Sequence, residues 1–202
     1  MHGPEDLGKR AAGWLTGRIP ARLRIIEQRL DLEPLSLADP AQVLDHERGP
    51  IGLEDWPSVF VLPLGTTRTE LVDVEDGGAE QYLTTYRMQV LAWVRADSYE
   101  ATSRLRLRYA LAIREALLER KSMTLGNGTV LGNPDSDLAV DPRSIVENYS
   151  PVLEDEAKRT IAGVDLTLNV IVRELLEPPP PYGTVATTAV DVAPLPVHPS
   201  LS

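Results

Sequence analysis

The chain has 202 residues, of which 43% are apolar and 25% are charged, a composition typical of a globular protein and not of a disordered chain. Its length suits one domain with appendages. The absence of cysteine excludes disulfides, thiol catalysis and cysteine-ligated metal centres. The longest uninterrupted apolar runs, 90–94 and 109–113, are far shorter than the roughly 20 residues that cross a bilayer. No N-terminal apolar run precedes a cleavage site, so we expect neither a membrane span nor a signal peptide.

The net charge is −10, from 20 Lys and Arg against 30 Asp and Glu, which argues against general binding to nucleic-acid phosphates. The charge is also uneven. Residues 1–30 and 98–121 together hold 12 basic and 6 acidic residues, and the rest of the chain holds 8 basic and 24 acidic. This asymmetry either favours self-association, with a basic helix of one copy facing an acidic surface of another, or reflects solvated helix faces.

The N-terminal quarter of the chain predicts a helix followed by a connection. Apolar residues recur at helical spacing over residues 5–30. Pro20 interrupts the pattern, which leaves either one kinked helix or two short ones. Residues 31–57 contain four prolines and little periodicity, so they predict a long irregular connection.

Two strands with a long segment between them are predicted next. The apolar run 58–64 is typical of a buried strand, and residues 82–96 alternate between an apolar and a polar face. The polar segment 66–81 contains an Asp-Gly-Gly turn signal and predicts a long protruding hairpin or loop. Leu91 and Trp93 interrupt the polar face of the second strand, which indicates that this face is covered too, for example by a neighbouring subunit.

A second helix is predicted over 98–121, opened by a capping-box pattern that begins at Asp97. Arg104 and Arg108 lie one turn apart on its polar side. Arg106 lies on the apolar side, where it either extends to the edge of the helix or pairs with an acid on another element.

The C-terminal part predicts a second strand pair, 144–153 and 161–176, and 129–131 could form a further small strand. Four consecutive prolines then end the sheet, and residues 178–202 predict an extended proline-rich arm. The order of elements predicts an α+β fold for residues 1–177, with helices packed on one face of a mostly antiparallel sheet.

The sequence holds no convincing catalytic or cofactor-binding motif. The three histidines are isolated, and Gly126-x-Gly128 neither follows a strand nor opens a helix, as a dinucleotide-binding motif would. Asp135 and Asp137 have the spacing of calcium ligands but lack the glycine and the distal glutamate of an EF-hand loop, and the acidic run 154–156 is typical of a solvated turn. We therefore expect no enzyme activity, no metal ion and no cofactor.

The order of elements resembles that of the tail terminator proteins of long-tailed bacteriophages. The local resemblance is carried by Y-R-M-Q-V-L-A-W-V-R-A-D-S-Y-E-A, residues 86–101, a strand that leads through a capping acid into a helix. The resemblance covers about residues 1–177 and leaves the arm unmatched.

What this resemblance implies is assembly and not catalysis. Members of the family form a hexameric ring on the last ring of the tail tube, stop its elongation and join the tail to the neck below the head. The implied partners are other copies of the chain, the tail tube protein, a head–tail connector or neck protein, and DNA that passes through the lumen without specific binding. The implied location is the virion, after assembly in the host cytoplasm.

Two other functions remain open. Another neck protein, such as a head-completion, stopper or tail-completion subunit, could be built from the same elements. A small-ligand-binding or enzymatic α+β domain belongs to a different class, and the lack of convergent polar motifs disfavours it.

Three groups of residues are expected to carry the contacts of such a ring. The subunit-interface residues are Arg104, Arg106, Arg108, Leu91 and Trp93. The residues expected to contact the tube or the lumen are Glu70, Asp73, Glu75, Asp76 and Glu80. The arm is expected to bind a partner through a β-branched segment that includes Val185, Val190 and Val192.

Overall fold

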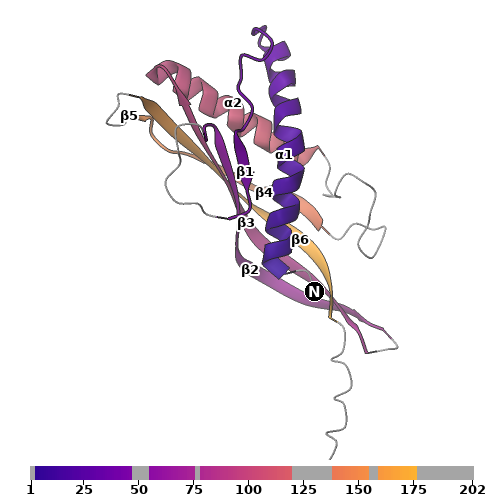
Figure 1. Cartoon of the computed structure of the whole chain (residues 1–202). Coiled ribbons are helices and arrows are strands. Elements are labelled where there is room, and N and C mark those ends of the chain that lie inside the picture. The colour runs from indigo at the N-terminus through magenta and orange to yellow at the C-terminus, as the bar shows by residue number, and fades with distance from the viewer. Residues whose placement is uncertain (1–2, 47–54, 76–77, 120–137, 155–158, 177–202) are drawn as a thin grey trace, which may run out of the picture.

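A computed structural model of the chain describes residues 3–46, 55–75, 78–119, 138–154 and 159–176 (Figure 1). The elements, in chain order, are α1 (Gly3–Arg29), β1 (Gln42–Leu44), β2 (Ser58–Val74), β3 (Glu80–Ala96), α2 (Tyr99–Leu118), β4 (Leu138–Tyr149), β5 (Leu153–Glu154) and β6 (Thr160–Leu176). The predicted arm, 178–202, and the small strand at 129–131 lie outside the described residues.

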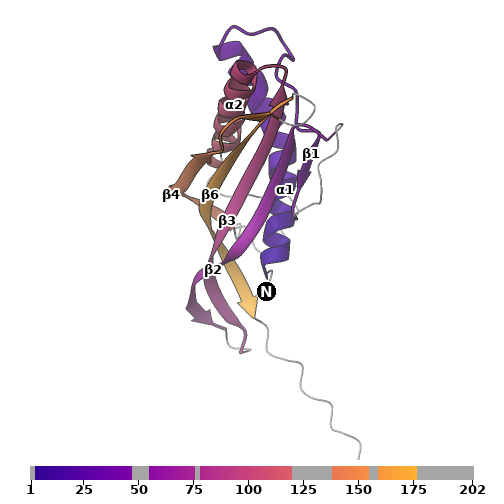
Figure 2. The ribbon, with the colours of Figure 1, turned by 90° about the vertical axis from the view of Figure 1, so that its left-hand side faces the viewer.

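The six strands form one sheet with the order β1-β2-β3-β6-β4, in which β5 also pairs with β6. Every pair is antiparallel except β1 with β2. The sheet lies in front of both helices in Figure 2, so the helices cover one face only. The α+β fold with a mostly antiparallel sheet, predicted from the order of elements, is confirmed.

The core lies between the two helices and the sheet. Alternate residues of β3 and β6, including Met88, Val90 and Leu166, face the helices and are almost fully buried. α1 is one continuous helix with Pro20 inside it, and not two short helices. Leu15 and Ile19 before the proline and Leu23 after it are all buried in the same core, and this packing holds the helix together across the missing hydrogen bond.

Much of the basic charge of α1 is paired with α2. The Arg22 guanidinium lies 3.2 Å from the Glu119 carboxylate and 3.7 Å from that of Glu115. Arg29 also pairs with Glu115, and Arg18 lies 3.5 Å from Glu119. The Trp14 indole N–H donates to the Ala116 carbonyl at 3.0 Å. Ion pairs within one chain therefore neutralise part of the basic charge that the sequence concentrates in the two helices.

Two local details differ from the sequence prediction. The connection 31–57 contains a short strand, β1, which pairs in parallel with Ser58–Phe60 of β2. The N-cap of α2 is Ser98 and not Asp97, because the Ser98 hydroxyl accepts the Ala101 amide hydrogen at 3.2 Å. An acid next to a serine obscures the position of the cap in the sequence.

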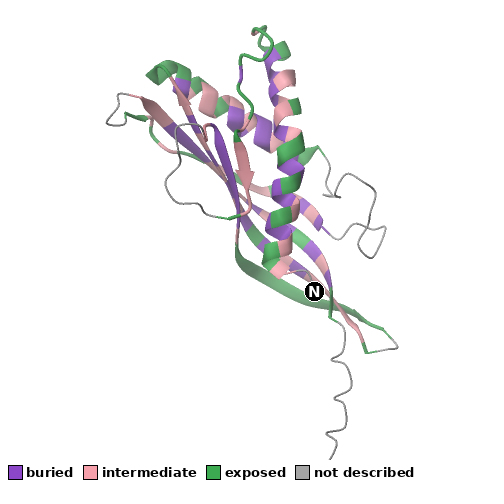
Figure 3. Ribbon diagram, in the orientation of Figure 1, coloured by how far each residue is buried: buried purple, intermediate pink, exposed green. Residues whose placement is uncertain are grey.

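The segment predicted as a hairpin or loop is a hairpin built mostly of paired strand. β2 continues to Val74 and β3 begins at Glu80, with β6 paired to β3 as far as Leu176. We call residues 65–74, 80–87 and 169–176 the extension. It projects beyond the N-terminal end of α1 (Figure 1), and its β2 strand is exposed along its length (Figure 3).

Candidate assembly interface

The sheet face opposite the helices, which we call the open face, carries the side chains that the sequence had assigned to the polar side of β3. It consists of Leu83, Thr85, Arg87, Gln89, Leu91 and Trp93 on β3, their partners Gly163, Asp165, Thr167, Asn169, Ile171 and Arg173 on β6, and Val146 and Asn148 on β4. Leu91 and Trp93 are only half-buried there, and Val146 is 55% exposed. These apolar side chains form a surface without helical cover.

A hollow of about 270 Å³ opens on this face beside Trp93. Leu91, Asn148 and Asp165 contribute to its walls. A Cβ atom at Gly163 would lie 3.0 Å from the Trp93 ring and 3.1 Å from the Ser150 hydroxyl, so glycine allows the indole to lie on the backbone of β6. The sequence indicated Leu91 and Trp93, but a lone glycine across the sheet gave no sign of this contact.

A second, polar hollow of about 430 Å³ lies next to the first, with Asn148 in the wall of both. Arg87, Ser144, Thr167 and Asn169 also line it, and none of its described lining residues is acidic. The open face therefore combines an apolar hollow with a polar one, as the contact surface of a protein partner does.

Arg106, predicted to lie at a subunit interface, makes contacts within its own chain. Its guanidinium donates to the Ser150 carbonyl and stacks on the Tyr149 ring, 5.3 Å from the ring centre. Burial, together with the hydrogen bond to Glu147, raises the pKa of Tyr149 to about 12. Arg106 thus holds the end of β4 beside the apolar hollow, and among the described residues it forms no ion pair with an acid.

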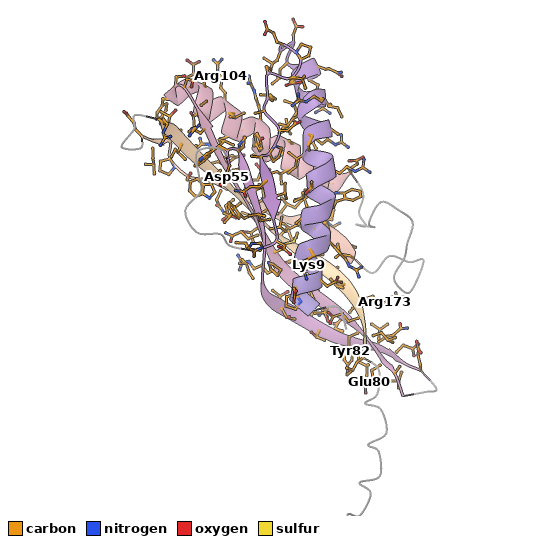
Figure 4. The ribbon with its side chains drawn as sticks, in the orientation of Figure 1. Lys9, Asp55, Glu80, Tyr82, Arg104 and Arg173 are labelled. Carbon is orange, nitrogen blue, oxygen red and sulfur yellow. The ribbon has the colours of Figure 1, made fainter. Side chains whose placement is uncertain are left out.

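Arg104 and Arg108 lie on α2 at the other end of the molecule from the extension. Arg104 is exposed and pairs with Glu100 one turn away, and Arg108 is half-exposed. Figure 4 shows Arg104 far from Glu80 and Tyr82, which mark the extension. The two arginines remain candidates for contact with another copy.

The described acidic residues that were expected to contact the tube or the lumen lie on the surface of the extension. Glu70, Asp73 and Glu75 are exposed. Glu70 pairs with Arg68, Glu75 accepts a hydrogen bond of 3.1 Å from the Gln81 amide, and Glu80 accepts one from the Tyr82 hydroxyl. Asp76 and the arm residues Val185, Val190 and Val192 lie outside the described residues.

Exposed apolar side chains accompany these acids. Leu71, Val72 and Val74 on β2 are 53%, 50% and 54% exposed. Leu71 and Val74 pair with Tyr82 and Glu80 and so share one face, whereas Ile171 and Leu175 of β6, 37% and 36% exposed, lie on the other, so both faces of the extension carry apolar surface. A sheet fragment of this kind gains little from its own packing and is suited to contact with a partner.

A buried carboxylate that the sequence analysis did not single out ties the extension to α1. Glu174 is 2% exposed and accepts hydrogen bonds from the Tyr86 hydroxyl at 2.8 Å, the Thr84 hydroxyl at 3.0 Å and the Gly3 amide at 3.2 Å. Burial and the hydrogen bond to Glu174 raise the pKa of Tyr86 to about 12. Position 174 continues the alternating buried series of β6, and this periodicity was the signal that could have found it.

In the described part of the chain, no three His, Asp or Glu side chains are grouped so that they could hold a metal ion. His46 lies at the surface, 2.7 Å from the Asp45 carboxylate. None of the described helices is both long and apolar enough to cross a membrane.

No protein-family model matches the sequence, and no curated protein matches it either.

Proposed function

We propose that this protein is a structural subunit of a phage virion, a tail terminator that forms a ring, caps the tail tube, stops its elongation and joins the tail to the head or neck. The proposal combines the resemblance in element order with the surface of the fold. The ring is made of copies of this chain, in line with the hexamers of the family that it resembles.

The observation that carries the proposal is the open face of the sheet. Both helices pack on the other face, and the open face keeps half-buried Leu91 and Trp93 and exposed Val146 around two adjacent hollows. Apolar surface around shallow hollows is typical of a contact between proteins. Within the described residues, this face holds no cluster of acids and histidines of the kind that a metal-dependent enzyme uses.

The acidity of the chain is compatible with DNA passage. A net charge of −10 repels phosphates, so a lumen lined by acidic residues would let DNA pass without retaining it. Glu70, Asp73 and Glu75 on the extension are the exposed acids that we assign to the lumen or to the tube contact.

The test is the size of the purified protein, followed by mixing with purified tail tubes. A particle several times the 22.2 kDa chain that caps tube ends in electron micrographs is expected. A ring that binds capsids alone would make the protein another neck subunit. A monomer that binds neither would contradict the proposal.

A matched pair of variants tests the open face. Val146→Arg places a charge on the β4 side of this face, at the wall of the second hollow, whereas Leu30→Arg places it at the end of α1, where the leucine is 51% exposed. Both positions are exposed, so both variants should fold. We expect Val146→Arg to abolish the ring and Leu30→Arg to leave it intact, and equal ring formation by the two variants would exclude the open face as the interface.

A further inference from the structure

Among the described residues, the outer edge of β2 is unpaired along most of its length. β1 pairs only with Ser58, Val59 and Phe60, and no other described strand lies beside β2 on that side. Residues 61–74 therefore pair with β3 alone. An edge of this length presents a row of backbone N–H and C=O groups to any strand that can reach it.

Two features of this edge suit a specific partner. The pairing of β2 with β3 shifts register between Thr66 and Arg68 and again between Leu71 and Asp73. Such bulges bend the strand and make it a poor template for indiscriminate pairing. The exposed Leu71, Val72 and Val74 supply apolar contacts that a strand laid along the edge would cover.

The chain itself contains a segment with the right chemistry. Residues 184–192, T-V-A-T-T-A-V-D-V, are rich in β-branched side chains and carry a single charge, Asp191. Prolines at 194 and 196 would end a strand formed there. Nine residues are enough to follow the edge from Val74 back to Thr66.

The start of the arm favours the edge of another copy. β6 ends at Leu176, opposite Glu80, at the tip of the extension. Residues 177–180 each precede a proline, which restricts all of them to extended conformations. At about 3.1 Å per residue, the chain should travel roughly 15 Å past the tip before Tyr182 and Gly183 allow a turn. If the arm turned back to β2 of its own chain, about half of residues 184–192 would be needed to cover the distance back to the tip before pairing could begin.

We propose that residues 184–192 of one copy add a strand to the outer edge of β2, along residues 66–74, of the neighbouring copy. This inference rests on the proposed self-association in a ring. Each copy donates one arm and receives one, and this head-to-tail arrangement closes into a ring when the rotation between copies allows it. Main-chain hydrogen bonds supply the affinity, and the valines of the arm meet the apolar side chains of the extension.

Cysteine cross-linking tests the contact directly, because the natural chain has no cysteine. One full-length protein carries Glu70→Cys, and a second, tagged protein carries Val185→Cys, Thr188→Cys or Asp191→Cys in turn. The two are mixed and oxidised. We expect a disulfide between tagged and untagged chains for at least one arm position, and only background cross-linking when exposed Glu33→Cys replaces Glu70→Cys.

Amide exchange gives a second readout in the full chain. A variant with Thr187→Pro and Val190→Pro cannot form the strand, and a variant with Thr187→Val and Val190→Ile keeps strand propensity. The amide hydrogens of residues 66–74 should exchange at least about tenfold more slowly in the wild type and in the second variant than in the proline variant.

The outcomes separate this inference from the proposed function. Rings without the cross-link and without protected amides would overturn the arm contact and leave the ring standing. A disulfide within one chain that carries both cysteines, formed while the protein is monomeric, would overturn the assignment to a neighbour. A protein that never self-associates would overturn both proposals.

Discussion

At the scale of single residues, two buried carboxylates hold segments together that are distant in sequence. Glu174 joins β6 to β3 and to the first residue of α1. Glu27, on α1, is 3% exposed and accepts the Leu37 amide at 2.7 Å and the Leu35 amide at 3.1 Å. Each carboxylate satisfies donors that would otherwise be buried without partners.

The first prediction concerns Glu174. Glu174→Ala leaves two hydroxyls and an amide without their acceptor, so we expect a loss of about 2–4 kcal/mol in the free energy of unfolding. Glu174→Gln can keep one oxygen on Tyr86 and Gly3 and donate to the Thr84 hydroxyl, so it should lose less than half as much. Urea unfolding measures both, with exposed Glu70→Ala as the control. Equal losses for the two Glu174 variants would contradict the role of the oxygen acceptor.

The second prediction is a pH dependence at Glu27. Burial alone would raise the pKa of this carboxyl, but the amide hydrogen bonds from Leu37 and Leu35 and the Arg24 charge outweigh burial and hold the pKa below 4.5. A lowered pKa stabilises the folded state fully above the unfolded pKa, and this contribution disappears as the pH falls through the folded pKa. The stability difference between wild type and Glu27→Gln should therefore be constant above about pH 4.5 and shrink below it.

Urea unfolding of both proteins from pH 7 down to about pH 3 measures this difference. A difference that does not change over this range would show that the Glu27 carboxylate contributes nothing through its charge.

At the scale of elements, the extension differs from the body of the sheet. In the body, β3 and β6 alternate between buried and half-buried residues because the helices cover one face. In the extension, β2 is exposed from Leu64 to Val74 although it remains paired with β3. Its outer part, residues 71–74 and 80–83, contains no buried residue and is held mainly by main-chain pairing, so it contributes little to folding.

The third prediction follows from this contrast. A triple variant, Leu71→Thr, Val72→Thr and Val74→Thr, keeps strand propensity and removes exposed apolar surface. We expect the free energy of unfolding to change by less than about 1 kcal/mol. Capping of tail tubes should fall at least tenfold, as measured by counting capped ends in electron micrographs. Normal capping would show that the apolar surface of the extension is not used.

At the scale of the whole molecule, the exposed Arg104 and the acidic extension lie at opposite ends. Arg104 is at one end and Glu80 at the other (Figure 4), whereas the arginines of α1 are paired with Glu115 and Glu119 inside the chain. Separated charges of opposite sign favour head-to-tail contact between copies.

The fourth prediction tests that contact. Arg104→Glu with Arg108→Glu should leave the monomer folded, because exposed ion pairs contribute little to stability, and should prevent the ring, because like charges at an interface are costly. Sedimentation velocity measures the oligomer. Lys9→Glu with Arg143→Glu changes the net charge equally at two other exposed positions and should leave the ring intact. Rings formed equally by both double variants would contradict the prediction.

Periodicity in the sequence determined the elements and their buried faces. Alternation along 82–96 predicted which side chains of β3 face the helices, and helical spacing placed Arg104 and Arg108 on the polar side of α2, because burial on one face imposes the period of each element. The same alternation showed that Leu91 and Trp93 are apolar residues on the polar face of β3.

Only the tertiary structure decided how these faces are used. Several contacts join residues from different parts of the chain, and no local pattern encodes such contacts. They are Gly163 under Trp93, the hydrogen bonds to Glu174 and Glu27, and the contact of Arg106 with Tyr149 and Ser150. The short strand β1 and the continuation of α1 through Pro20 are likewise products of packing, which outweighs local propensity when it buries enough apolar surface. The sequence alone thus determined the α+β class and its core, while the open face and the unpaired edge of β2 follow from strand order.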